Sequence, residues 1–303
     1  MDVGVIGFGT MGKNHVRVYS ELKNVGTVGV YDVSQKAAAE IGTRHDARVY
    51  GSVEELLKHS DAVSICVPTQ FHAGIAREVF AAQCAALIEK PICSTSIEAK
   101  NLMKAAPDGI TIGVGHIERF NPIVGEIRRI IDDPFYIEMK RHNPASARVK
   151  GSTVVEDLMI HDIDILQHIF FENIPCDIQT VGNADVCSVM MKCGHVPVSL
   201  SASRKSSKKI RLIYIEQEEF TIEGDFMTQE VTIYRKPGQY RLEAERYVQE
   251  NIIEKVMVNK LEPLKLELAT FVKCAKSGSP FPITPDQAIR NLEVCESIRS
   301  GFC

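Results

Sequence analysis

The first 118 residues alternate short apolar runs with longer amphipathic stretches. The apolar runs predict strands, namely VGVIG, TVGVYD, DAVSICVP, AALIEK and TIGVGH. The stretches between them predict helices. The first begins at about Gly12, and the others are residues 34–41, VEELLKH, HAGIAREVFAAQ and SIEAKNLMKAA. Strands that alternate with helices at this spacing are typical of βαβ units. We therefore predict an α/β fold whose N-terminal domain, residues 1–118, is a doubly wound parallel sheet of the Rossmann type.

From Phe135 onward the apolar positions recur every second residue. One more helix, from Pro122 to about Asp132, precedes these strand-like runs, which are FYIEMKR, DIQTVGNADV, VPVSLSASR, KIRLIYIEQ, EFTIEG and QEVTIYR. Such alternation predicts a mostly antiparallel open sheet, with one face polar or covered by a partner. Two helices, about Leu264 to Lys276 and Pro285 to Ser300, close the chain. We predict a C-terminal α+β domain over residues 119–303.

Composition narrows the class of protein. A chain of 303 residues that is 45% hydrophobic favours two domains. A net charge of -4 and a pI near 6.2 predict no attraction to nucleic acid or to an anionic membrane, which favours a small-molecule partner. No uninterrupted apolar stretch approaches the roughly 20 residues that span a bilayer, and we expect a cytoplasmic protein.

The cysteines show no metal-binding or disulfide pattern. Nine are present without a C-x-x-C pair or a repeated spacing, which argues against a zinc ribbon and against a disulfide framework. We expect most of them to be reduced and several to be buried.

A glycine-rich turn follows the first predicted strand. Gly7, Gly9 and Gly12 fit G-x-G-x-x-G between a strand and a helix, and Phe8, Thr10 and Met11 complete the turn. Such a turn lets the backbone approach a pyrophosphate at a helix N-terminus. Asp32, at the end of the second strand, would accept hydrogen bonds from ribose hydroxyls and repel the 2'-phosphate of NADP, so we predict NAD as cofactor. The alternative is an ordinary βα turn in which Asp32 caps the next helix.

Two further segments end strands at the carboxyl edge of the sheet, where ligands of open α/β sheets bind. Pro68, Thr69 and His72 follow the predicted strand DAVSICVP; His72 would either contact the nicotinamide half of the cofactor or cap a helix. Glu89 and Lys90 precede Pro91, and X-Pro bonds are the ones commonly found in the cis form. Such a bend would aim Lys90 into a cleft.

The order and spacing of these motifs resemble the Gfo/Idh/MocA oxidoreductases over nearly the whole chain. The matching segments are GFGTMGKNH, VPTQFH, EKP and DLMIHDIDIL, the last resembling the D-x-x-x-H signature of the family. Within the family, GHIERFNP and DLMIHDID are most similar to UDP-N-acetylglucosamine 3-dehydrogenases and related nucleotide-sugar dehydrogenases. The resemblance implies an NAD-dependent enzyme that oxidises the 3-hydroxyl of a UDP-sugar, with Lys90, Asp157 and His161 as its catalytic set. The C-terminal domain would then bind substrate and form oligomers.

The residue types in this set suit the oxidation of an alcohol. Asp157 and His161 lie four apart on a predicted helix and share a face. While the hydride leaves, the hydroxyl proton needs a base, and His161 has a suitable unperturbed pKa of about 6.5. We prefer His161 as base, Lys90 as the group that polarises the reacting oxygen and Asp157 as its orienting partner, although exchanged roles for Lys90 and His161 fit equally well. Asp164 and His168 extend the polar stripe, but hydride transfer requires no metal and we predict none.

Several polar residues are candidates for binding the substrate diphosphate. Arg119 precedes a helix for which Asn121 is a good N-cap and Pro122 a favoured first residue. A guanidinium at a helix N-terminus suits phosphate oxygens. Arg141 and Asn143 end the first strand of the second domain and would face the same ligand. The basic run RKSSKKIR is interpreted as a solvated hairpin, not a nucleic-acid patch.

The sequence is also compatible with other functions. One alternative is a dehydrogenase or reductase of the same family that acts on a free sugar or inositol. Another is a non-catalytic protein of this fold that senses NAD or a sugar, against which the presence of Lys90, Asp157 and His161 argues. An open sheet with a hydrophobic face commonly needs a partner, so we expect a homo-oligomer, a dimer or a tetramer.

Overall fold

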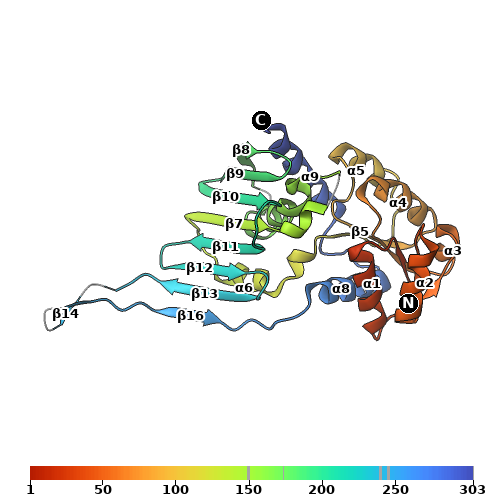
Figure 1. Cartoon of the computed structure of the whole chain (residues 1–303), viewed down its shortest axis with the longest axis horizontal. Helices are drawn as coiled ribbons and strands as arrows, with labels where there is room; N and C mark the ends of the chain where they lie inside the picture. Colours follow the sequence, from red (N-terminus) through yellow and green to blue (C-terminus); the bar gives the residue numbers. More distant parts are fainter. Residues whose placement is uncertain (149–150, 173, 239–240, 244–245, 303) are drawn as a thin grey trace. The chain divides into compact units, whose positions relative to one another are not determined.

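The computed structural model describes residues 1–148, 151–172, 174–238, 241–243 and 246–302, drawn in Figure 1. These residues divide into two compact units. Unit 1 comprises Met1–Phe120 and Glu262–Glu293, and unit 2 comprises Asn121–Leu261 and the chain from Val294 onward. The predicted division at residues 118 and 119 therefore differs from the structure, which assigns residues 262–293 to unit 1. The physical reason is that buried apolar side chains of this segment, including Leu268 and Phe271, belong to the core of unit 1.

Unit 1 is built on a parallel sheet with helices between its strands. Its strands are β1 (Val3–Ile6), β2 (Val28–Tyr31), β3 (Arg48–Val49), β4 (Ala62–Ile65), β5 (Ala85–Glu89) and β6 (Ile112–Gly115). Its helices and helical turns are α1 (Thr10–Glu21), α2 (Gln35–His45), α3 (Val53–Leu57), η1 (Thr69–Phe71), α4 (His72–Ala81), α5 (Ser96–Met103), η2 (Ile117–Phe120), α8 (Pro263–Ser277) and the first part of α9 (Pro285–Ser300). Within this unit α1 packs beside α2 and α8, and α4 packs beside α5 (Figure 1).

The order of the strands confirms the predicted doubly wound sheet. In the described part of unit 1 it is β3-β2-β1-β4-β5-β6, all parallel. The strand β3 is absent from the predicted strands, because its two residues, Arg48 and Val49, are exposed and too few to show a pattern. The central strands β1, β4 and β5 are buried along their whole length, as expected for a sheet covered on both faces.

Local signals explain where several helices begin. Ser34, Ser52 and Thr95 cap α2, α3 and α5 by accepting hydrogen bonds from Ala37, Glu55 and Glu98 respectively. Asn121 caps α6 (Pro122–Ile130) with Pro122 at its first position, which confirms that prediction.

Unit 2 is a mostly antiparallel sheet with helices packed on one face. Its strands are β7 (Tyr136–His142), β8 (Cys176–Gly182), β9 (Val186–Cys193), β10 (Val196–Ser203), β11 (Ile210–Glu216), β12 (Phe220–Asp225), β13 (Glu230–Arg235), β14 (Arg241–Glu243), β15 (Arg246–Val248) and β16 (Ile253–Val256). Its helical elements are α6, η3 (Pro144–Arg148), the π-helix η4 (Val155–Met159), α7 (Ile160–Ile165), the π-helix η5 (Leu166–Phe170) and the last part of α9. The buried residues of β9 alternate strictly with exposed ones, so one face of the sheet forms the core.

Among the described residues the large sheet has the order β16-β13-β12-β11-β7-β10-β9-β8, and β14 pairs with β15 in a separate hairpin. This confirms the predicted mostly antiparallel sheet, with β7 and β10 as a parallel pair. The interpretation of RKSSKKIR as a hairpin is wrong, because β10 and β11 lie on opposite sides of β7. Arg204 is buried beside Asp185, and its Nη2 donates to the Ser152 carbonyl.

The predicted strand DIQTVGNADV is split by a turn. β8 ends at Gly182, whose φ of 153° lies in a region open to glycine, and the Asn183 side chain accepts from the amides of Asp185 and Val186. The chain then returns as β9, of which only Val186 falls within that run, and residues 187–193 belong to no predicted strand.

The same hairpin joins two cysteines. Cys176 and Cys193 lie opposite each other in β8 and β9 and form a disulfide, which the cysteine spacing did not indicate because the pairing depends on strand register. The free cysteines of the described residues are buried, as expected; they are Cys66, Cys84, Cys93, Cys187, Cys274 and Cys295. Cys303 lies outside the described residues. No helix in the described part of the chain is long and apolar enough to cross a membrane.

Candidate active site

Each of the three glycines in the glycine turn of unit 1 is required for a different physical reason. Gly7 has a φ of 92°, and a Cβ there would lie 2.8 Å from the Val67 amide nitrogen. A Cβ on Gly12 would lie 1.9 Å from the Gly7 carbonyl oxygen, so the first turn of α1 packs directly on the glycine loop. Gly9, by contrast, has no described heavy atom within 4 Å of a Cβ position, and it precedes α1 without a side-chain cap. The open backbone at Gly9 and the N-terminus of α1 therefore fit a phosphate.

Asp32 is fixed next to this turn by two backbone amides. Its Oδ2 accepts from the Phe8 amide at 2.6 Å, and its Oδ1 accepts from the Ser34 amide at 2.7 Å. The alternative in which Asp32 caps the next helix does not hold, because Ser34 is the residue that caps α2. An ionised carboxylate has about four lone-pair sites, so the oriented Asp32 keeps acceptor capacity for ribose hydroxyls.

His72 does not take either of the predicted roles. It is the first residue of α4, and its ring is buried. Its Nδ1 lies 2.9 Å from the Pro91 carbonyl oxygen and its Nε2 lies 2.8 Å from the Val67 carbonyl oxygen, while burial lowers its pKa. The ring therefore packs between the loop after β4 and the turn after β5, and in its neutral form it donates to one of these two carbonyls. Pro68 and Thr69 lie in that loop, with Pro68 exposed and Thr69 half-buried.

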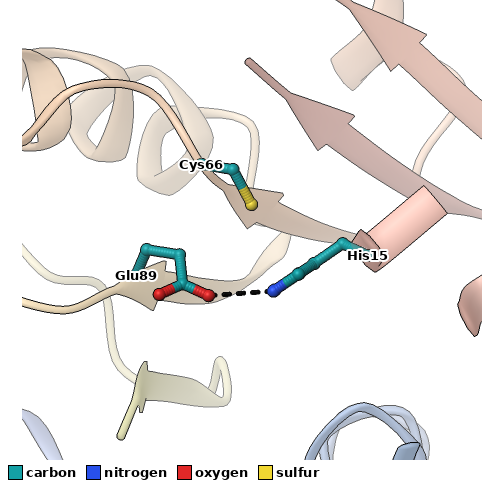
Figure 2. A group of neighbouring side chains, drawn as sticks. All are labelled: His15, Cys66 and Glu89. Carbon is teal, nitrogen blue, oxygen red and sulfur yellow. Dashed lines mark hydrogen bonds and ion pairs between the residues drawn. The ribbon is translucent and has the colours of Figure 1, made fainter. Parts of the chain in front are cut away.

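Glu89 and Lys90 end β5 at the same edge of the sheet. Glu89 is only 6% exposed, and its Oε1 lies 2.9 Å from Nε2 of His15 in α1 (Figure 2). Its Oε2 accepts from the Lys90 amide at 3.3 Å, so the carboxylate serves contacts inside unit 1, and its predicted contact with the cofactor stays a prediction. Lys90 is half-buried, and the Lys90-Pro91 bond is cis, the form considered from the sequence.

The charge state of Glu89 follows from its neighbours. Burial raises its pKa, but the hydrogen bond from His15 and the attraction of nearby cationic groups, Lys90 among them, outweigh burial and hold the pKa below the ordinary value. The carboxyl is therefore ionised and accepts the Nε2–H of His15. Sequence reasoning did not select His15; the signal is a histidine on the buried face of α1, beside Val16 and Tyr19.

Three ligand atoms, from His15, Cys66 and Glu89, lie within 4.8 Å of one another (Figure 2). These residue types can bind a transition metal. Two observations favour a hydrogen-bonded pair instead. Nε2 of His15 and Oε1 of Glu89 already bond to each other, although Nδ1 of His15 has no partner among the described residues. Burial raises the pKa of the Cys66 thiol well above its ordinary value, which keeps it protonated.

Asp157 and His161 lie in unit 2 on a helix that is not regular. The π-helix η4 contains Asp157, α7 contains His161, and a second π-helix, η5, follows. A π-turn is wider than an α-turn, so Asp157, His161, Asp164 and His168 are not spaced as on the regular α-helix that was predicted. Asp164 is 1% exposed, whereas Asp157, His161 and His168 are half-buried, and Asp157 accepts a hydrogen bond from Ser146. Single-turn π-helices occur frequently at functional sites, which is consistent with a site at Asp157 and His161.

The structure does not support two of the predicted diphosphate contacts. Arg141 is 1% exposed, and its Nε and Nη2 donate to Asp162 Oδ1 at 2.9 and 2.6 Å. Residues of β7 alternate in burial, so Arg141 shares the core face with Ile137 and Met139, a parity that the sequence already contains. Asn121 is also buried: its Oδ1 caps α6, and its Nδ2 donates to the Phe226 carbonyl.

The other two candidates are more accessible. Arg119 is half-buried in unit 1, and its Nη1 donates to Gln287 Oε1 at 2.7 Å and to the Pro282 carbonyl at 3.4 Å. Asn143 is half-buried in unit 2, where its Oδ1 accepts from the Ala145 amide at 3.3 Å.

Comparison with known proteins places this architecture in a family. Residues 1–116 match the group described as "Oxidoreductase family, NAD-binding Rossmann fold". The chain is 32% identical to the UDP-N-acetylglucosamine 3-dehydrogenase of Acidithiobacillus ferrooxidans over 245 residues, which cover 78% of this chain and 77% of that protein. It is 27% identical to an inositol 2-dehydrogenase of Cereibacter sphaeroides over 175 residues, about half of each chain (54% and 52%).

Solved structures show the same likeness. The A. ferrooxidans UDP-N-acetylglucosamine 3-dehydrogenase superposes with a TM-score of 0.86 at 27% identity, covering 100% of this chain and 97% of that one. A levoglucosan dehydrogenase in complex with NADH and levoglucosan shares the fold, with a TM-score of 0.83 at 17% identity over 99% and 96% of the two chains. The chain belongs to the Gfo/Idh/MocA family of NAD-binding oxidoreductases.

Proposed function

We propose that the protein is an NAD-dependent dehydrogenase that oxidises the 3-hydroxyl of a UDP-sugar, UDP-N-acetylglucosamine, to the 3-keto sugar. The observation that carries this proposal is the 32% identity to a UDP-N-acetylglucosamine 3-dehydrogenase over 245 residues. That span is longer than either compact unit, so the likeness extends into both.

The preference for NAD over NADP rests on Asp32. Its carboxylate is held beside the glycine turn by the amides of Phe8 and Ser34. A negative charge fixed at this point accepts hydrogen bonds from the ribose hydroxyls of NAD and repels the additional phosphate of NADP. When bound, NAD supplies the carbon that accepts the hydride.

Lys90, Asp157 and His161 are the proposed catalytic residues. His161 takes the proton of the 3-hydroxyl, Lys90 donates a hydrogen bond that stabilises negative charge on the reacting oxygen, and Asp157 orients the donor. The exchange of roles between Lys90 and His161 remains compatible with the structure, since both side chains are half-buried and so partly reachable from solvent.

The proposed contacts to the substrate diphosphate now involve fewer residues. Arg141 and Asn121 serve the core of unit 2 and are removed from the set. Arg119 and Asn143 remain as proposed diphosphate contacts, and the three catalytic residues contact the sugar. The preference for a nucleotide sugar over a free sugar would then depend chiefly on Arg119, whose guanidinium suits phosphate oxygens.

We further propose that the protein is a homo-oligomer, a dimer or a tetramer. The face of the large sheet opposite the core carries exposed apolar side chains, among them Val181, Met190 and Leu212. Exposed apolar side chains on the open face of a sheet are the kind of surface that a second protein chain can cover.

A second candidate function is the oxidation of inositol or a free sugar. It is favoured by the inositol 2-dehydrogenase relative at 27% identity, although that likeness covers only 54% of the chain. A free sugar would leave the diphosphate contacts without a ligand.

The deciding experiment measures NADH formation with UDP-N-acetylglucosamine, with free N-acetylglucosamine plus UDP, with glucose and with inositol. Oxidation of the alcohol is uphill near neutral pH, so each assay contains hydroxylamine to trap the ketone. We expect turnover with the nucleotide sugar and little with the free sugars, because binding energy from the nucleotide helps to position the hydroxyl. Efficient turnover of inositol without any response to the trapped nucleotide sugar would refute the proposal in favour of the second candidate.

A further inference from the structure

The main chain at Lys90 is held from both sides by buried contacts within unit 1. On one side the Lys90 amide donates to Glu89, and Glu89 in turn pairs with His15 (Figure 2). On the other side Nδ1 of His72 lies 2.9 Å from the carbonyl oxygen of Pro91. The peptide that carries the proposed catalytic lysine is therefore fixed by side chains that do not themselves belong to the proposed catalytic set.

The pair of His15 and Glu89 is built into the core. His15 is 0% exposed and Glu89 is 6% exposed. A Cβ on Gly115, at the end of β6, would lie 3.1 Å from Cδ of Glu89 and 3.2 Å from both of its oxygens, so the carboxylate packs closely against this glycine. A buried carboxylate needs a partner, since breaking a buried charged pair by removing one member is strongly destabilising.

His15 also connects Lys90 to the proposed cofactor site. It belongs to α1, the helix that starts at the glycine turn, and it lies three residues after Gly12. Gly12 itself packs against the Gly7 carbonyl. A chain of direct contacts thus runs from the glycine turn through α1, His15 and Glu89 to the Lys90 amide.

We propose that His15 and Glu89 form a positioning pair that fixes the main chain of Lys90 relative to the glycine turn. The inference rests on the proposed function, because the catalytic value of the pair depends on the role of Lys90. Neither His15 nor Glu89 reacts with the substrate in this proposal. Their effect is to hold the lysine where its ammonium group meets the reacting oxygen.

The test uses four forms of the full-length chain beside the wild type. His15→Ala removes the hydrogen-bond donor to Glu89, and His15→Gln restores a donor on a side chain of similar reach. The double variant His15→Ala/Glu89→Ala removes the carboxylate together with its partner, so it leaves no unpaired buried charge if the single variant folds poorly. Tyr19→Phe is the matched control, because Tyr19 is buried on the same helix but bonds to Ser64 and not to Glu89.

One readout is independent of catalysis. The chain contains two Glu-Lys junctions, at residues 89–90 and 254–255. Labelling the glutamate carbonyl with carbon-13 and the lysine amide with nitrogen-15 therefore isolates the amide signals of Lys90 and Lys255. Their hydrogen exchange can be followed together, with Lys255 as the internal reference. The second readout is the set of kcat, KM for the nucleotide sugar and Kd for NADH, the last from the change in NADH fluorescence.

In His15→Ala and in the double variant we expect the Lys90 amide to exchange at least about tenfold faster while Lys255 is unchanged. We expect kcat to fall by roughly 100-fold, as for a misplacement of about 1 Å, with Kd for NADH changed by less than about threefold. His15→Gln should recover most of both losses, and Tyr19→Phe should show neither.

Wild-type Lys90 exchange and wild-type kcat in folded His15→Ala would overturn the inference, as would equal effects in Tyr19→Phe. The failure of the proposed function gives a different result. In that case the wild type forms no NADH from any nucleotide sugar, while the response of the Lys90 amide still decides whether the pair positions this residue.

Discussion

Asp32 combines two tasks in a single side chain. Its carboxylate accepts the amides of Phe8 and Ser34, and it presents a fixed negative charge beside the glycine turn. We predict that Asp32→Asn, which keeps the shape and one oxygen but loses the charge, raises the ratio of kcat/KM for NADP to kcat/KM for NAD by at least about tenfold, or about 1.4 kcal/mol. Steady-state kinetics with both cofactors measures this ratio.

The matched control is Glu40→Gln, which removes an exposed carboxylate from α2 without touching the turn. It should leave the ratio unchanged. An unaltered ratio in Asp32→Asn would show that this residue does not select the cofactor.

Lys90 and His161 are expected to act on the reacting oxygen more than on the cofactor. We predict that Lys90→Met and His161→Asn each lower kcat by at least about 100-fold while Kd for NADH changes by less than about threefold, because their contacts matter chiefly in the transition state. Lys58→Met serves as the control, since Lys58 is an exposed lysine paired with Glu54. Activity close to that of the wild type in either variant would remove that residue from the catalytic set.

The contrast between Arg119 and Arg141 shows what residue identity alone misses. Both arginines stand at ends of elements, and both suit a phosphate by chemistry. Arg141 is instead paired with Asp162 inside unit 2, since the alternation along β7 directs it to the core face. The alternation along β7 is visible in the sequence. The buried partner, Asp162, lies twenty-one residues further along the chain, and only the packing of β7 and α7 brings it to Arg141.

At the scale of elements, the glycine turn contains one glycine that we expect to matter for stability, Gly12, and one that we expect to matter for cofactor binding, Gly9. A Cβ on Gly12 would overlap the Gly7 carbonyl, whereas a Cβ on Gly9 meets open space. We predict that Gly12→Ala lowers the melting temperature and that Gly9→Ala leaves it near the wild-type value. Gly9→Ala should nevertheless weaken NADH binding by about tenfold or more, because its methyl group would stand where the pyrophosphate approaches.

Thermal unfolding and NADH fluorescence titration distinguish these effects. Gly74→Ala is the control, since Gly74 lies in α4 with no described atom within 4 Å of its Cβ position and should gain about 0.5–1 kcal/mol of stability without a change in NADH affinity. Unchanged NADH binding in Gly9→Ala would mean that the phosphates do not lie at this turn.

The segment with Asp157 and His161 is an element that spacing described only in part. The i, i+4 relation suggested one face of a regular helix, yet π-helical turns flank α7 on both sides. π-turns are rare in proteins. Here the side chains of Val155, Leu158 and Met159 are buried in the core of unit 2, and this packing stabilises the turn. The residue types were therefore visible from the sequence, but their angular relation was not.

At the scale of the whole molecule, the chain crosses between the two units more than once. Phe271 in α8 is buried in the core of unit 1, and Ile298 in α9 is buried in the core of unit 2. We predict that Phe271→Ala costs about 3–5 kcal/mol and accelerates amide exchange within residues 1–120, although it lies far from them in sequence. Ile298→Ala should accelerate exchange within residues 121–261 instead. Hydrogen-exchange mass spectrometry reads both effects, and a uniform loss of protection in both variants would contradict the division into two units.

The sequence by itself determined the alternation of strands and helices, the parallel sheet of unit 1, the glycine turn with Asp32, and the family, because these features depend on local periodicity and on residues close along the chain. Tertiary structure decided the rest. It assigned residues 262–293 to unit 1, separated β10 from β11 by β7, joined Cys176 to Cys193, and turned His72, Asn121 and Arg141 inward. Each of these outcomes depends on which distant segments share a core or a strand register. Burial of apolar surface by such segments sets the contacts, and spacing along one chain does not specify which segments meet.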